Sequence, residues 1–195
     1  MKIVFASNND HKLKEIKSLI DDDYELLSLS DLDINVDIPE EEPTLEGNAL
    51  SKAGFIKKLT GFNVFADDTG LEVEALDGLP GVKSARFAGE GRDFSANIDL
   101  LLSMLGDNPN RKARFRTVFA LIYNDEEYLM EGIVEGVIIH ERKGNNGFGY
   151  DPVFIPNGAT KTFAEMELSE KKMLSHRARA LEKLCVKLRQ LGNIN

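Results

Sequence analysis

Apolar residues recur at helical spacing in four segments of the chain. In the first segment Leu13, Ile16, Leu19 and Ile20 fall on one face while lysines occupy the other, which is the pattern of a helix that packs on a core. The same spacing of three and four residues continues in the other three segments. We therefore predict helices over about residues 10–20, 44–59, 94–105 and 170–191.

Apolar runs between these helices predict strands. The runs at 3–6, 64–66 and 71–73 are short, whereas those at 114–123 and 128–138 are longer and rich in β-branched and aromatic side chains. Asn124 and Asp125 separate the two long runs and are common turn residues, so they predict an antiparallel hairpin. Strands that alternate with helices, together with one hairpin, indicate the α/β class with a mixed sheet.

Length and composition indicate one globular domain over residues 1–195. Apolar residues make up 42% of the chain and charged residues 29%, which excludes a disordered chain. The formal net charge of −9 argues against binding to nucleic acid or to an anionic membrane along an extended surface. The single cysteine, Cys185, excludes an intramolecular disulfide and a multi-cysteine zinc site, and it is expected to be a small buried side chain.

No secretory signal or membrane span is expected. The apolar start of the chain, residues 3–6, runs directly into a polar segment and is far shorter than the roughly 20 residues of a spanning helix. We therefore expect a cytoplasmic enzyme, or a cytoplasmic protein that binds a small ligand.

The polar segment between the first strand and the first helix is a candidate phosphate site. Its small side chains leave backbone amides able to point at an anion, and the positive end of the helix dipole adds to the attraction. The alternative is that this segment only caps the helix, since Asn and Asp are favoured N-caps. The residues concerned are Ser7, Asn8, Asn9, Asp10, His11 and Lys12.

Adjacent carboxylates follow the run at 64–66 and form a candidate metal site. Asp67 and Asp68 repel each other unless a positive charge compensates them, and Mg²⁺ prefers carboxylate oxygens. Thr69 adds a hydroxyl, and Gly70 permits a sharp turn. The acidic run 40–42 could supply a further ligand. The alternative for both segments is a solvated acidic loop.

Two segments near the C-terminus are candidates for binding a flat ligand. In residues 144–152 glycines lie beside Phe148, Gly149, Tyr150 and Asp151, so an aromatic face stands next to a carboxylate that can accept from a base N–H. Near the start of the last helix, cations and a histidine could close over a polyphosphate and a purine; the residues are Lys171, Ser175, His176 and Arg177. An ordinary glycine loop and a basic helix face are the alternatives.

Taken together and in this order, the motifs resemble the Ham1-like inosine triphosphate pyrophosphatase family over nearly the whole chain. The matching pieces are Ser7-Asn8-Asn9 with Lys12, Thr44 with Asn48-Ala49 and Lys52, Ala66-Asp67-Asp68-Thr69-Gly70-Leu71, Gly78-Leu79-Pro80-Gly81 with Ser84-Ala85-Arg86, Gly147-Phe148-Gly149-Tyr150-Asp151-Pro152, Lys161-Thr162 and Ser175-His176-Arg177. Each piece is weak alone, whereas their order and combination are specific.

The resemblance implies a fold, an activity and roles for these residues. The fold would be a long mixed sheet flanked by helices, with two lobes and an active-site cleft between them, in a homodimer. The activity would be Mg²⁺-dependent hydrolysis of ITP, dITP and XTP to the monophosphate and pyrophosphate. Asp68 would be metal ligand and acid–base residue, and Glu40, directly after Pro39, the second ligand, with Glu41 and Glu42 as less favoured candidates.

The remaining residues would bind the substrate. The resemblance implies that the segment from Ser7 to Lys12, Lys52 and Lys171 hold phosphates, that Phe148 stacks on the base, and that Asp151, His176 and Arg177 hydrogen-bond to its edges. Thr69 stands where members often have serine, which keeps the hydroxyl and adds a methyl group. The resemblance also implies that Gly149 and Tyr150 bind the substrate, because they belong to the same motif.

Two other functions compete with this one. A Maf-type pyrophosphatase would share the general architecture and cleave pyrimidine nucleotides, and the segments at 148–151 and 176–177 favour purines instead. A nucleotide sensor would bind without turnover, and Asp68 next to the phosphate-binding motifs argues against it. The sequence leaves open the ranking of inosine against xanthosine substrates and of ribose against deoxyribose.

Overall fold

The structure is a computed structural model that describes residues 2–20 and 24–192. The chain divides into two compact units. Unit 1 comprises residues 1–68, 117–132 and 177–195, and unit 2 comprises residues 69–116 and 133–176. Three long strands contribute residues to both units, namely β3 (Val64–Val73), β5 (Lys112–Tyr123) and β6 (Glu126–Ile138).

Within the described residues, the strands form one mixed sheet of seven strands. The order is β2-β1-β3-β5-β6-β7, with β4 paired to β3. Strand β1 (Lys2–Phe5) runs parallel to β2 (Glu25–Leu27) and to β3, whereas β4 (Pro80–Gly81) is antiparallel to β3 and β7 (Phe154–Pro156) is antiparallel to β6. The predicted α/β class with a mixed sheet is confirmed. The cleft between two lobes stays a prediction.

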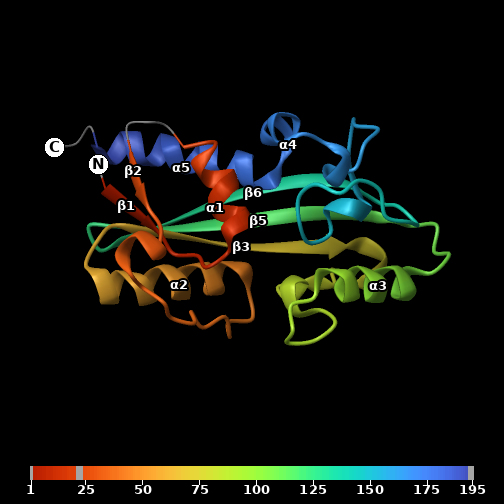
Figure 1. Cartoon of the computed structure of the whole chain (residues 1–195), viewed down its shortest axis with the longest axis horizontal. Coiled ribbons are helices and arrows are strands. Elements are labelled where there is room, and N and C mark those ends of the chain that lie inside the picture. Colours follow the sequence, from red (N-terminus) through yellow and green to blue (C-terminus); the bar gives the residue numbers. More distant parts are fainter. Residues whose placement is uncertain (1, 21–23, 193–195) are drawn as a thin grey trace. The chain divides into compact units, whose positions relative to one another are not determined.

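In unit 1 the sheet is covered on both faces. Figure 1 shows α1 (Asp10–Lys17) and α5 (His176–Gly192) on one side of these strands and α2 (Leu45–Thr60) on the other. On the α1 and α5 side, the rings of Phe5 and Phe65 stack at 4.9 Å, and Phe65 meets Phe119 edge-on at 5.7 Å. Cys185 is buried in the same cluster, as expected. Burial of these rings and of the aliphatic side chains around them stabilises this unit.

Unit 2 has a core of its own. Helix α3 (Phe94–Leu105) supplies Leu101, and the 3₁₀ turn Phe163–Glu165 supplies Phe163. Phe115 of β5 contacts the ring of Phe154 at 4.8 Å. The short helix α4 (Leu168–Leu174) completes the unit. Two separate apolar clusters explain why the chain forms two compact units.

Most predicted elements are found close to their expected bounds. The helix at 94–105 has the predicted limits, and the helices near 10–20 and 44–59 are α1 and α2. The two long runs form β5 and β6, and both turn residues between them have positive φ angles, 50° at Asn124 and 66° at Asp125. These are the left-handed conformations that a tight two-residue hairpin turn requires.

Two predictions of local structure are wrong. The runs at 64–66 and 71–73 belong to the single strand β3, so Gly70 lies inside a strand and not at a turn. A side chain there would place its Cβ 2.6 Å from the carbonyl oxygen of Gly81, so glycine is needed for close pairing with β4. The helix predicted over 170–191 is divided into α4 and α5, because Ser175 is extended, with ψ of 151°.

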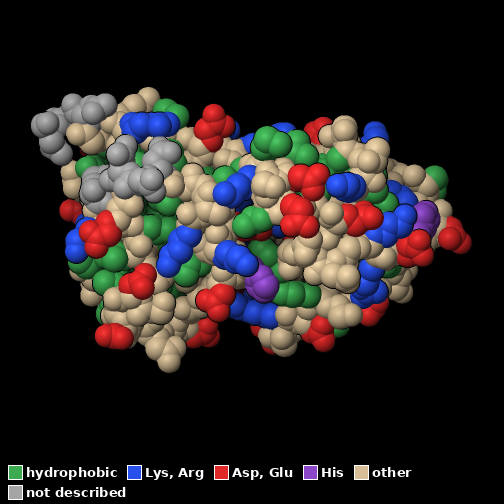
Figure 2. All heavy atoms as spheres, turned by 45° about the horizontal axis from the view of Figure 1, so that its top comes forward, with side chains coloured by type: hydrophobic (Ala, Val, Ile, Leu, Met, Phe, Trp, Pro, Cys, Tyr) green, Lys and Arg blue, Asp and Glu red, His purple; other side chains and the backbone are tan. Residues whose placement is uncertain are grey.

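The surface carries charges of both signs. Figure 2 shows acidic and basic side chains interspersed over the face drawn, without one dominant patch of either sign. None of the helices in the described part of the chain is long and apolar enough to cross a membrane.

Candidate active site

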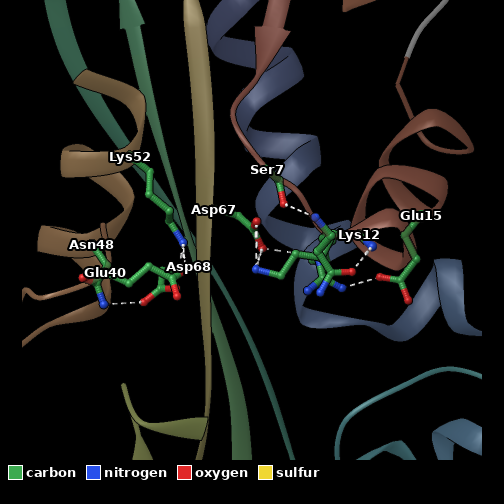
Figure 3. Close-up of polar contacts among 10 residues, drawn as sticks. Ser7, Lys12, Glu15, Glu40, Asn48, Lys52, Asp67 and Asp68 are labelled. Atoms are coloured by element: carbon green, nitrogen blue, oxygen red, sulfur yellow. Dashed lines mark hydrogen bonds and ion pairs between the residues drawn. The ribbon is translucent and has the colours of Figure 1, made fainter. Parts of the chain in front are cut away.

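The two adjacent aspartates point in opposite directions from β3. Side chains alternate between the faces of a strand, so Asp67 faces the side of α1 and Asp68 faces the side of α2 (Figure 3). Both carboxylates are buried, Asp68 with 7% of its surface exposed. Their mutual repulsion is therefore relieved by separation, and each has a lysine of its own.

Asp67 lies among cations from two helices. The ammonium of Lys12 is 3.0 Å from each carboxylate oxygen of Asp67, and Nε of Arg177 is 3.6 Å from Oδ2. Arg177, only 1% exposed, also forms an ion pair with Glu15 of α1. Sheet and helices thus bury Arg177, Asp67 and Glu15 and leave Lys12 half-buried, and charges in such a place need their partners.

Asp68 lies in a second polar group, formed with α2 and the segment before it. Lys52 Nζ is 3.0 Å from Asp68 Oδ1 and 2.8 Å from Glu40 Oε1, and Asn48 Nδ2 donates to Asp68 Oδ2 at 3.1 Å (Figure 3). Asn48 and Lys52 are four residues apart and share one face of α2. We call the residues around Asp67 and Asp68 the charged cluster; it contains Lys12, Glu15, Glu40, Asn48, Lys52, Asp67, Asp68 and Arg177.

The pKa values in the charged cluster move in opposite directions. Burial would raise the pKa of Asp67, but Lys12 and Arg177 outweigh it and lower that pKa from 3.8 to about 2. Burial raises the pKa of Asp68, and Lys52 opposes this effect without cancelling it. Burial would lower the pKa of Lys52, but Asp68 and Glu40 raise it. Asp67 is thus a fixed negative charge, whereas Asp68 is the stronger base.

The position of Glu40 distinguishes it from the two glutamates that follow. Its carboxylate meets Lys52, whereas Glu41 and Glu42 are exposed and the backbone N–H of Glu42 donates to Asn48 Oδ1 at 2.9 Å. Within the described residues, no group of three or more His, Cys, Asp or Glu side chains is arranged around a metal position. The carboxylates of Asp68 and Glu40 both converge on the ammonium of Lys52. Such a pair fits Mg²⁺, which commonly binds one or two carboxylates and completes its coordination shell with water and phosphate oxygens.

The segment from Ser7 to Lys12 caps helix α1 and also brings the ammonium of Lys12 next to Asp67. Asn9 is the N-cap of α1, since its Oδ1 accepts from the N–H of Lys12 at 3.1 Å, and Ser7 Oγ accepts from the N–H of Asn9 at 3.2 Å. Asn8 donates to the carbonyl of Val36 at 2.8 Å. The remaining two residues of the segment, Asp10 and His11, are exposed. These residues therefore do cap helix α1, as the alternative interpretation predicts, and the Lys12 ammonium also lies beside Asp67.

In unit 2 one carboxylate organises the glycine-rich segment 144–152, which we call the aromatic loop. Asp151 Oδ2 accepts from the N–H of Phe148 at 2.9 Å and from Lys171 Nζ at 2.7 Å. A Cβ at Gly147 would lie 2.1 Å from the same oxygen, and φ there is +75°, so only glycine fits. Gly149 is also in the left-handed region, with φ of 62°. The ring of Phe148 is partly exposed on this frame.

Two of the predicted basic residues lie within unit 2. Lys171 is buried, with its ammonium 5.3 Å from the ring centre of Phe148 and 5.5 Å from that of Phe163. The His176 ring stacks on Phe115, at 4.6 Å with an angle of 14° between the planes. Lys171 and His176 thus belong to unit 2, where Lys171 contacts the aromatic loop, whereas Lys12, Lys52 and Arg177 belong to unit 1.

Tyr150 connects the aromatic loop to the turn that follows β4. Its hydroxyl donates to the carbonyl of Ser84 at 2.9 Å, and burial raises the pKa of Tyr150, so the hydroxyl remains a donor. Ser84 Oγ accepts from the N–H of Leu71 at 2.8 Å and donates to the carbonyl of Gly81 at 2.6 Å. The loop is therefore fixed to β3 just beyond Thr69.

Sequence reasoning missed two members of the charged cluster as site residues. Asn48 entered only as part of the family motif, and its four-residue spacing from Lys52 was the available signal. Glu15 was not singled out, although it directly precedes Ile16 on the buried side of the first helix, where an acidic residue needs a partner. That partner, Arg177, is 162 positions away in the chain, so no local pattern indicates it.

The chain is similar to known proteins over nearly its whole length. The model of the Ham1 family matches residues 3–187. A dITP/XTP pyrophosphatase of Porphyromonas gingivalis is 52% identical over 184 residues, which cover 94% of this chain and 95% of that protein. Another, of Flavobacterium psychrophilum, is 50% identical over 184 residues, with 94% and 97% coverage.

Solved structures agree with the sequence comparison. The Ham1 protein of Staphylococcus aureus superposes with a TM-score of 0.88 at 39% identity and covers 97% of this chain and 99% of its own. The nucleoside-triphosphatase, or dITP/XTP pyrophosphatase, of Mycobacterium abscessus gives a TM-score of 0.76 at 44% identity, with 94% and 98% coverage. The resemblance inferred from the motifs is confirmed, and the chain belongs to the Ham1 family.

Proposed function

We propose that the protein is a nucleoside triphosphate pyrophosphatase that hydrolyses dITP, XTP and ITP to the monophosphate and pyrophosphate. The relatives at 50% and 52% identity are dITP/XTP pyrophosphatases, and they match 94% of this chain. The single structural observation that carries the proposal is the placement of Lys52 between Asp68 and Glu40. A cation held between the buried carboxylate of Asp68 and the half-buried carboxylate of Glu40 suits a site that balances the charge of a polyphosphate.

The charged cluster is suited to Mg²⁺ as well as to phosphate. Asp68 and Glu40 would hold the ion, and Mg²⁺ bound there would neutralise charge on the phosphate oxygens and orient them. The net negative charge of the protein is compatible with an anionic substrate because lysines and a divalent cation reverse the sign locally.

The protein's own residues would cleave the bridge between the α- and β-phosphoryl groups. Water supplies a hydroxyl group to one phosphorus atom and a proton to Asp68, and the bridging oxygen leaves with the other phosphorus. Asp68 suits this role because its carboxylate is buried beside Lys52 and Asn48, among the residues that would hold the phosphates. Lys12, Lys52, Lys171 and the backbone of residues 7–12 would hold the phosphates, Thr69 would donate its hydroxyl, and Asp67 would keep Lys12 in place.

The base would be bound by the aromatic loop and the start of α5. Phe148 stacks on the purine, and Asp151, together with the loop backbone at Gly149 and Tyr150, contacts its edge. Arg177 donates to the 6-keto oxygen, which hypoxanthine and xanthine carry and adenine lacks. A guanidinium has five N–H donors. Arg177 is only 1% exposed and already contacts Glu15 and Asp67, so this contact requires its guanidinium to become accessible when the nucleotide binds. A backbone donor near His176 would disfavour the 2-amino group of guanine.

Two further properties follow from the family and stay predictions. A homodimer is expected, and the molar mass in solution, measured by light scattering, tests it. A cytoplasmic location is expected as well, and fractionation of cells followed by detection of the protein tests it.

A screen of nucleoside triphosphates tests the function. The purified full chain is incubated with Mg²⁺ and with ITP, dITP, XTP, GTP, ATP, CTP or UTP, and pyrophosphate release is followed while chromatography identifies the nucleotide product. We expect ITP to give IMP and pyrophosphate, with much slower turnover of ATP and GTP. IDP and orthophosphate would overturn the cleavage position, preference for CTP or UTP would indicate a Maf-type enzyme, and binding without turnover would indicate a sensor.

A further inference from the structure

Phe94, the first residue of α3, lies against Phe148 of the aromatic loop. The ring centres are 6.1 Å apart and the planes are inclined by 45°, a separation at which aromatic rings attract each other. Phe94 nevertheless keeps 38% of its surface exposed. A second aromatic surface is therefore accessible beside the ring that is proposed to stack on the base.

Exposure alone does not distinguish Phe94. Phe62, just after α2 in unit 1, is 37% exposed, and single apolar side chains on a surface are ordinary. The contact with Phe148 distinguishes Phe94, because it joins an exposed ring to a segment with a binding role. Phe62 is therefore a matched comparison, with the same side chain, nearly the same exposure and a location in the other unit.

Exposed polar contacts join the start of α3 to the segment before the aromatic loop. Arg142 lies just before the aromatic loop. Its Nη2 donates to the carbonyl of Ser95 at 2.9 Å and to Asp99 Oδ1 at 2.8 Å, so it contacts the first turns of α3. Asp93 caps the same helix by accepting from the N–H groups of Ser95 and Ala96. The start of α3 and the entrance to the loop are thus in direct polar contact.

The other end of the loop is closed by the backbone. The N–H of Lys143 donates to the carbonyl of Pro152 at 2.8 Å, and the N–H of Asn146 donates to the carbonyl of Ala164 at 3.0 Å. Phe148 therefore projects from a closed loop, and Phe94 projects from a helix anchored to that loop. The pair is preorganised, so a ligand need not order it on binding.

We propose that Phe94 is a second aromatic residue of the purine-binding pocket, in contact with the base together with Phe148. This inference rests on the proposed function. A phenyl ring has no hydrogen-bonding group to distinguish one purine from another, so Phe94 adds affinity for every purine nucleotide and leaves the choice among them to polar groups. Its loss should raise KM for ITP, dITP and XTP by a common factor and leave kcat nearly unchanged.

The test compares Phe94→Ala with Phe62→Ala in the full chain. Steady-state kinetics give kcat and KM for ITP, XTP and ATP, and calorimetry gives the dissociation constant of IMP. We expect Phe94→Ala to raise KM and to weaken IMP binding by about 3- to 10-fold, Phe94→Tyr to restore both, and Phe62→Ala to match the unmodified protein. If Phe94→Ala does not fold, Phe94→Leu replaces it, since leucine keeps an apolar side chain on the helix.

The outcomes separate this inference from the function on which it rests. An unmodified protein that does not hydrolyse ITP refutes the proposed function. An active unmodified protein whose Phe94→Ala variant behaves like Phe62→Ala refutes the role of Phe94 alone. A loss confined to kcat, or a loss for ITP that ATP does not share, overturns the proposed contact with the base.

Discussion

The charged cluster of unit 1 and the aromatic loop of unit 2 are built by different means. In the charged cluster, regular elements carry nearly every side chain, and the pleat of β3 assigns each aspartate to its own lysine. In the aromatic loop, glycines with positive φ angles and one buried carboxylate, Asp151, fix the backbone. Charge balance defines the first region, and loop conformation defines the second.

This difference teaches how catalysis and selectivity can be separated. Every nucleoside triphosphate carries the same phosphates, so a cluster that holds them cannot distinguish one base from another. A loop that presents aromatic rings and a few polar groups can distinguish bases without altering the cluster. With the exception of Arg177, which is proposed to contact the base, substitutions in the charged cluster should therefore change turnover or stability, and those of aromatic-loop side chains that touch the base should change affinity.

The largest effect is expected from Asp68→Asn. The change preserves size but removes the base and one negative ligand, so kcat for ITP should fall by about 10²- to 10⁴-fold. Turnover at saturating Mg²⁺ and ITP measures this, with Asp37→Asn as the control because Asp37 is an exposed aspartate in the segment before Glu40. Retention of most of the turnover would remove Asp68 from the mechanism.

Asp67 should govern stability in acid. Its pKa is lowered from 3.8 to about 2, so the folded state favours the ionised form and gains stability above pH 3.8, which is lost as the pH falls through about 2. The free energy of unfolding should drop by roughly 2 kcal/mol over this range because of Asp67 alone. Asp67→Asn should be less stable near neutral pH and should lose less on acidification, as urea unfolding at several pH values measures. Parallel curves for the two proteins would contradict the assignment.

Arg177→Ala tests whether one residue serves both regions. Arg177 contacts Glu15 and Asp67, so its loss should lower the free energy of unfolding. Arg177 is also proposed to donate to the 6-keto oxygen, so its loss should reduce the ratio of kcat/KM for ITP to kcat/KM for ATP by roughly tenfold or more. Kinetics with both nucleotides measure the ratio. An equal loss for ITP and ATP would show that Arg177 acts on the phosphates, and its assignment to the base would then be wrong.

Glu40→Gln tests the second metal ligand against its neighbour. Loss of one carboxylate should raise the Mg²⁺ concentration needed for half-maximal activity by roughly tenfold, whereas Glu41→Gln should leave it unchanged because Glu41 is exposed. A magnesium titration at fixed ITP measures both variants. Equal behaviour of the two would exclude Glu40 as a ligand.

The smallest effect is expected from Tyr150→Phe. The ring stays while the Ser84 carbonyl loses its donor, so the free energy of unfolding should fall by about 1 kcal/mol. Thermal unfolding measures the change, and Tyr128→Phe is the control, because its hydroxyl contacts Glu126 at the surface. The ITP to ATP ratio should not move; a shift would mean that the Tyr150 hydroxyl takes part in base selection.

Much of the fold could be predicted from the sequence because the long elements are strongly patterned. Helix α3 and the hairpin of β5 and β6 have clear periodicity and recognisable turn residues. Strands β2, β4 and β7 have only two or three residues each and exist through their pairing, which no local pattern records. Gly70 concealed the continuity of β3, because a glycine suggests a turn unless the close approach of Gly81 is known.

Prediction of the site from the sequence is limited in the same way. The motifs indicated the acidic and basic residues, but their pairing depends on tertiary structure. The ion pair between Lys171 and Asp151 joins residues 20 positions apart, and Lys12 meets Asp67 across 55 positions. The separation of the two aspartates onto opposite faces follows from alternation along a strand, once residues 64–73 are known to form one strand.

Two consecutive aspartates have a consequence for how β3 finds its place in the sheet. A slip of one residue would turn every side chain of the strand to the other face. Either Thr69 would then take the position of Asp68 or Ala66 that of Asp67, so one of the two lysines would lose its carboxylate. The buried charges therefore disfavour a slip in either direction. Phe65 and Ala66 add to this effect, because the phenyl ring packs against Phe5 and Phe119, whereas the methyl group lies on the opposite face of the strand. Two neighbouring charges and two apolar side chains of different size thus define one register for β3.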